Sequence, residues 1–130
     1  MRALDTNVLV RAFVQDDQAQ AQRALTCLND QTVYVPVTVI LELEWVLRSR
    51  YGFSARTIAD AIEKIAVLEN AVVGEQDAVA AAAAKLRRGW DFADALHHSL
   101  AIGCDEFVTF DTNLTKRADR AAASPPVTAI

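Results

Sequence analysis

Twice in this chain a short apolar stretch ends at Asp-Thr-Asn and leads directly into a segment with helical spacing. The first stretch stops at Asp5-Thr6-Asn7 and the second at Asp111-Thr112-Asn113. A buried strand that stops at a carboxylate, followed by a helix whose first polar residues cap it, accounts for this order. Ligands bind at the carboxyl edge of an open parallel sheet, so we expect both aspartates at that edge.

Strands and helices alternate along the rest of the chain. Strands are predicted at residues 1–4, 33–35, 71–73, 106–110 and 127–128, and helices at 8–13, 16–30, 38–51, 54–68, 75–88, 91–103 and 114–118. The pair Asp16-Asp17 and Ser54 are predicted helix caps. The alternation predicts an α/β fold, an α/β/α sandwich with a mostly parallel four- to five-stranded sheet covered on both faces. With neither repeats nor a linker, residues 1–130 form one expected domain.

Composition limits where such a protein works. Hydrophobic residues make up 52% of the chain and charged residues 23%, and no uncharged apolar run is long enough for a membrane span. The start carries no export signal. Cys27 and Cys104 fall in apolar stretches, which predicts reduced core thiols in a cytoplasmic protein. The net charge of −4 argues against a broad basic face that coats nucleic acid, but not against nucleic acid as a substrate.

Four acids are candidates for one site: Asp5, Glu42, Asp94 and Asp111. Glu42 and Asp94 lie in apolar helical segments, where a carboxylate needs a partner or a metal ion. Glu44 faces another side of its helix, and we favour Glu42 as the buried member of that pair. Asp91 lies three residues before Asp94 and is the cap, a residue that orients the metal ligands, or a ligand of a second metal ion. Capping alone accounts for each aspartate taken singly.

Carboxylates without cysteine ligands suit a hard cation such as Mg²⁺ or Mn²⁺. Such a site is best suited to phosphodiester cleavage, because the cation lowers the pKa of a bound water and stabilises charge on the phosphate oxygens. Neutral sugars and peptides gain less from this arrangement.

The same residues resemble a known family. Four motifs carry the resemblance: Asp5-Thr6-Asn7, Thr38-x-x-x-Glu42-Leu43, Phe92-Ala93-Asp94-Ala95-Leu96 and Val108-Thr109-Phe110-Asp111. Each is common by itself, but their order and spacing over residues 1–118 are similar to those of PIN domains, specifically the VapC toxins of bacterial toxin–antitoxin pairs.

The resemblance implies a metal-dependent endoribonuclease with a Rossmann-like sheet, usually a homodimer, inhibited by a VapB-type antitoxin. Carried over by position, Asp5, Glu42, Asp94 and Asp111 become the catalytic acids around Mg²⁺, with Asp5 and Asp94 as principal ligands. Thr6, Asn7, Thr109 and Asp91 become residues that orient these ligands or water. The chain has Asn113 where some members carry a further acid, so a fifth carboxylate is not assumed.

Other residues have simpler expected roles. His97 and His98 follow Asp94 at helical spacing, and partnering a buried carboxylate or binding phosphate is favoured over binding metal. Trp45 is expected in core or dimer packing. Lys116 and Arg117 are the basic residues nearest Asp111 in sequence and the best candidates for contact with the RNA backbone.

The sequence thus predicts a Mg²⁺-dependent ribonuclease toxin that cleaves RNA, such as tRNA or another structured RNA. One alternative is a PIN-like module with a degenerate site that only binds RNA or protein. Another is a phosphatase of the haloacid-dehalogenase type, which also begins with a strand and an aspartate. That family needs a second acid two residues on, where this chain has Asn7.

Overall fold

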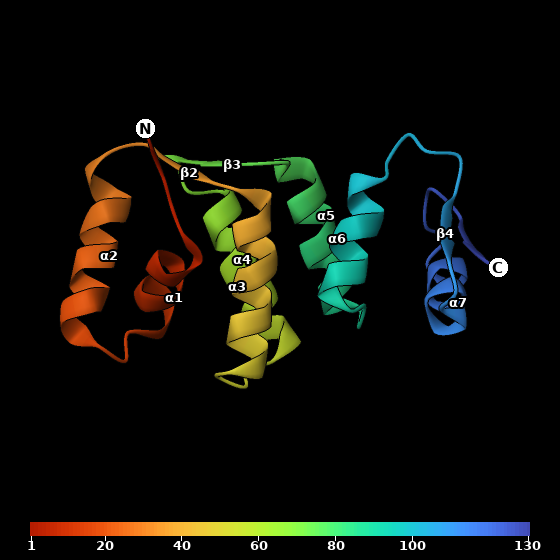
Figure 1. Cartoon of the computed structure of the whole chain (residues 1–130), viewed down its shortest axis with the longest axis horizontal. Coiled ribbons are helices and arrows are strands. Elements are labelled where there is room, and N and C mark those ends of the chain that lie inside the picture. The colour runs from red at the N-terminus through yellow and green to blue at the C-terminus, as the bar shows by residue number, and fades with distance from the viewer.

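The computed structural model describes all residues from 1 to 130 and confirms the alternation of strands and helices (Figure 1). In chain order the elements are β1 (Arg2–Ala3), α1 (Thr6–Val14), α2 (Gln18–Asp30), β2 (Val33–Val35), α3 (Val37–Ser49), α4 (Ala55–Ala66), β3 (Ala71–Val73), α5 (Gln76–Arg87), α6 (Phe92–Leu100), β4 (Phe107–Thr109), α7 (Thr112–Arg120) and β5 (Val127–Ala129). No helix combines the length and the apolar character that crossing a membrane requires.

Local chemistry sets the helix starts where the sequence predicts them. The Asp17 side chain accepts a hydrogen bond from the Gln20 backbone N–H, and the Ser54 hydroxyl accepts one from Thr57. Both bonds satisfy amide groups that have no partner inside the helix. The predicted caps at these two positions are confirmed.

All strand pairs are parallel, as predicted, but the strands are divided between two sheets rather than gathered in one. β1, β2 and β3 form a three-stranded sheet in that order, with Ala3 opposite Tyr34 and Tyr34 opposite Val72. β4 and β5 form a separate pair in which Val108 lies opposite Thr128. The expected α/β class is confirmed, and β1 and β4 are each left with one unpaired edge.

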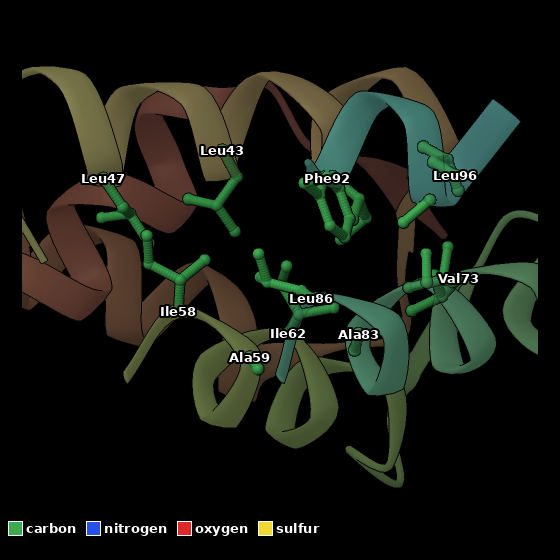
Figure 2. Close-up of a cluster of buried hydrophobic side chains, with 14 of the residues drawn as sticks. Leu43, Leu47, Ile58, Ala59, Ile62, Val73, Ala83, Leu86, Phe92 and Leu96 are labelled. Atoms are coloured by element: carbon green, nitrogen blue, oxygen red, sulfur yellow. The ribbon is translucent and has the colours of Figure 1, made fainter. Parts of the chain in front are cut away.

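One continuous apolar core joins the helices. Leu43 and Leu47 of α3 face Ile58 and Ile62 of α4, and Phe92 of α6 closes the same cluster (Figure 2). The buried positions on α4 follow the spacing of one helical face, which explains why this helix packs with a single side inward.

The unit of β4, α7 and β5 is fixed to the end of the core formed by α5 and α6. Leu114 of α7 and Val127 of β5 belong to the same buried cluster as Trp90, and the ring of buried His98 lies against Phe107. This packing is the physical reason why β4 does not lie beside β1.

The prediction that both cysteines are core thiols is wrong for one of them. Cys27 is half-buried against the core, whereas Cys104 is exposed in the turn that follows α6. The apolar segment that suggested burial ends earlier than expected, because α6 stops at Leu100.

Candidate active site

Asp5 is available to bind a ligand. It occupies the position just before α1, with extended backbone angles, yet its side chain makes no hydrogen bond to the helix, and the residue is exposed. A carboxylate at a helix start normally caps that helix. Because the cap bond is missing, both oxygens of Asp5 are free of protein partners, which is what a cation ligand requires.

Glu42 lies beside the start of the same helix. The hydroxyl of Thr6, which is buried, donates a hydrogen bond to Glu42 Oε1 and so ties α1 to α3. Thr6 therefore orients one of the predicted acids, in keeping with its predicted role. Asn7 points elsewhere and lines a hollow between α1 and α2 together with Arg11 and Arg23.

Asp91, Asp94 and Asp111 form a second group of acids. The Asp91 side chain caps α6 by accepting a bond from the Asp94 N–H at 3.1 Å. Asp94 is partly buried, and burial raises the pKa of its carboxyl. The negative charges of Asp91 and Asp111 raise this pKa further, while nearby His97 partly offsets them. Negative charge thus accumulates here without a paired cation.

Asp111 is held in place by the start of α7. Its Oδ1 accepts hydrogen bonds from the N–H groups of Asn113 and Leu114, at 2.9 and 3.1 Å. The hydroxyl of Thr109 accepts a bond from the Asp111 N–H at 3.0 Å, so Thr109 orients this acid. Oδ2 has no protein partner, and a single free oxygen still suffices for one metal ligand.

The acids do not gather into one cluster within a single chain. No group of three or more histidine, cysteine, aspartate or glutamate side chains lies close enough to hold a metal ion. The chemistry of the donors fits Mg²⁺, but their arrangement in one copy does not. The expectation that Asp5 and Asp111 meet at one sheet edge is not fulfilled within one chain, because their strands belong to different sheets.

Between the two groups lies a hollow that the sequence did not reveal. It is lined by Glu42, Trp45 and Arg48 of α3, and by Ala93, the neighbour of Asp94. Trp45 was expected in packing, but 49% of it is exposed, with the Arg50 guanidinium 5.9 Å from its ring centre. The hollow therefore offers an aromatic face beside a predicted catalytic acid.

The choice of Glu42 over Glu44 as the buried acid is wrong. The buried positions of α3 are Ile40, Leu43, Glu44 and Leu47, so the buried stripe includes Glu44 and leaves Glu42 exposed. Glu44 is compensated by Arg48, whose Nε lies 2.9 Å from its Oε2, and this hydrogen bond raises the pKa of the Arg48 guanidinium. The correction leaves Glu42 as the accessible carboxylate.

His98 has a structural role instead of binding a carboxylate or a phosphate. Its Nε2 lies 2.8 Å from the Pro125 carbonyl oxygen, which only accepts, so Nε2 donates. Nδ1 then accepts from Lys85 Nζ at 2.8 Å. Both ring nitrogens have protein partners, and the predicted phosphate or carboxylate role is wrong for His98. His97 is exposed beside Asp94.

Three arginines form a basic hollow where the end of α5 meets α7. Arg88, Arg117 and Arg120 line it around Trp90, and none of them has a carboxylate within ion-pair distance. Arg117 reaches this position by passing over Gly89, where a Cβ would come within 2.9 Å of its Nη1. Lys116 is exposed, outside the hollow.

The difference in burial between Glu42 and Glu44 can be tested by measuring stability. Glu44→Gln is expected to lower the free energy of unfolding by about 1 kcal/mol, because it weakens a bond to a guanidinium that is itself half exposed. Glu42→Gln should change it by less than about 0.5 kcal/mol, as for most exposed positions. Urea unfolding of both variants checks this, and an equal loss at both positions would contradict the assignment.

Comparison with known families identifies the family to which the chain belongs. The model of the PIN domain family matches residues 2–120. No curated protein and no solved structure matches the chain. The match covers both groups of acids and the basic hollow.

Proposed function

Because this chain belongs to the PIN domain family, generally a nuclease fold, we propose that it is a metal-dependent endoribonuclease of the VapC type. The main support is the coincidence of the family match with four acids at the motif positions, Asp5, Glu42, Asp94 and Asp111. PIN nucleases typically use divalent metal ions. Mg²⁺ is the proposed cofactor, with Mn²⁺ as a substitute, and these four acids are the proposed ligands.

The proposed biological role is that of the toxin in a toxin–antitoxin pair, with a VapB-type protein as inhibitor and RNA, such as tRNA, as substrate. The order of the four motifs supports this role. The protein is proposed to act in the cytoplasm as a homodimer. The phosphatase alternative loses its basis, because Asn7 replaces the acid that it needs and the family match points elsewhere.

The basic hollow supports an RNA substrate. Three unpaired guanidiniums suit phosphate groups, because arginine offers a planar set of donors that matches phosphate oxygens. Arg117 was the arginine predicted to contact RNA, and Arg88 and Arg120 extend that surface. Trp45 adds an exposed ring on which an unpaired base can stack. The chain thus combines phosphate contacts and a stacking surface despite its net negative charge.

Substitution of the proposed metal ligands tests the nuclease function. Asp5→Asn and Asp94→Asn are each expected to lower Mg²⁺-dependent RNA cleavage more than about 100-fold, since each removes a proposed metal ligand. Expression of either variant should no longer inhibit growth. EDTA should stop cleavage by the wild type, and Mg²⁺ or Mn²⁺ should restore it.

Asp30→Asn, at an exposed position at the end of α2, is the matched control and should cleave like the wild type. Cleavage retained by Asp5→Asn or Asp94→Asn would contradict the proposed site. A wild type that binds RNA without cleaving it would instead favour the alternative of a PIN-like binding module.

Removal of two arginines from the basic hollow tests whether this hollow binds RNA. Arg117→Ala combined with Arg120→Ala should reduce the slope of log affinity against log salt concentration by about 1.4 for single-stranded RNA, two phosphate contacts being lost. Binding is measured in EDTA, so that cleavage does not interfere. Arg56→Ala, which removes an exposed arginine of α4, is the control and should leave the slope unchanged. An unchanged slope in the double variant would place the RNA elsewhere.

A further inference from the structure

The strand β1 has a free edge. The Arg2 and Leu4 N–H groups bond to Thr32 and Tyr34 of the β2 side, at 3.2 and 2.9 Å. In a parallel strand, alternate residues direct their backbone groups to opposite sides. The N–H and C=O of Ala3 therefore point away from β2, and Ala3 is exposed.

The strand β4 has a matching free edge. The Phe107 N–H bonds to the Pro126 carbonyl at 2.9 Å, and the Thr109 carbonyl accepts from Ile130 at 3.0 Å, so both residues face β5. The backbone groups of Val108 and Phe110 consequently point the other way. Val108 is 49% exposed and Phe110 81% exposed. An open apolar edge of this kind favours pairing with another strand.

Within one copy the two edges do not meet. β1 lies near the N-terminal end of the molecule and β4 at the opposite end, with helices α3 to α6 between them (Figure 1). The β4–α7–β5 unit is held there by the bond from His98 to Pro125 and by burial of Leu114 and Val127. Pairing in the same chain would require these buried contacts to break.

We propose that two copies of this chain pair reciprocally, with β4 of each added in parallel to β1 of the other. Each sheet then has five strands in the order β3-β2-β1-β4-β5, and both free edges disappear. A closed dimer of this kind satisfies two-fold symmetry, because the same two strands meet twice.

The backbone groups determine the register of the new pair. The Ala3 N–H and C=O face β4, and they find partners in Val108 and Phe110 only if Ala3 lies opposite Thr109. Asp5 then comes level with Asp111 of the second copy, on neighbouring strands about 4.8 Å apart. The two Asp-Thr-Asn motifs thus meet at one sheet edge, as the sequence predicts, but between copies.

This arrangement accounts for the divided acids. Asp5 and Glu42 of one copy would share a site with Asp111 of the other. Asp94 adjoins both groups of its own chain, because its neighbour Ala93 lines the hollow with Glu42 and its charge interacts with that of Asp111. The composite site rests on the proposed nuclease function, whereas the strand pairing does not. The two are therefore tested separately.

Disulfide crosslinking tests the pairing without any activity. In a chain with Cys27→Ser and Cys104→Ser, Ala3→Cys combined with Thr109→Cys should give a covalent dimer on a non-reducing gel, since facing Cα atoms lie within disulfide reach. The control pair, Ala3→Cys with Tyr34→Cys, joins strands already paired within one chain and should give a crosslinked monomer. A crosslinked monomer from the test pair, a ladder of larger species, or no crosslink while the control reacts would each overturn the proposal.

Complementation tests the composite site. Asp5→Asn and Asp111→Asn chains, co-expressed with different tags and purified as the mixed dimer, should recover about half of wild-type cleavage, because one of two sites regains all its acids. Each variant alone should be inactive. An inactive mixed dimer, beside an active wild type, would overturn the composite site, whereas an inactive wild type would overturn the proposed nuclease function itself.

Discussion

The hydrogen bonds of the buried His98 ring determine where one half of the candidate site lies. The ring bonds to Pro125 on one side and to Lys85 on the other, and burial lowers the pKa of the Lys85 ammonium. Lys85 also donates to Ser99 at 2.7 Å. These bonds, together with Trp90, fix the segment before β5 against α5 and α6, and with it the position of Asp111.

Repulsion between carboxylates that lack a paired cation is the second constraint on the candidate site. Burial of Asp94, and then repulsion from Asp91 and Asp111, disfavours the charged state of its carboxyl and raises its pKa. Arg48, whose charge interacts with that of Asp91, is engaged by Glu44. A divalent cation bound here would relieve this repulsion, which supports the proposal that these acids are metal ligands.

The sequence predicted the elements well and their assembly less well. The apolar runs at 33–35 and 71–73, and the caps at Asp17 and Ser54, are local signals. The corresponding boundaries agree with the structure to within a few residues. The division into two sheets depends on the burial of His98 and Trp90, which no local pattern encodes. Glu42 and Glu44 lie two positions apart on α3, and only Glu44 falls on its buried stripe. The apolar spacing in the sequence did not show which of the two would be buried. The convergence of Arg88 and Arg120 with Arg117 arises from tertiary packing, which no local pattern predicts.

Binding of Mn²⁺ to the purified protein, followed by the loss of the free-ion signal in electron paramagnetic resonance, tests most directly whether these acids hold a cation. We expect saturable binding by the wild type that is lost in Asp5→Asn and in Asp94→Asn, while Asp30→Asn binds normally. Absence of binding by the folded wild type, or binding that survives both substitutions, would contradict it.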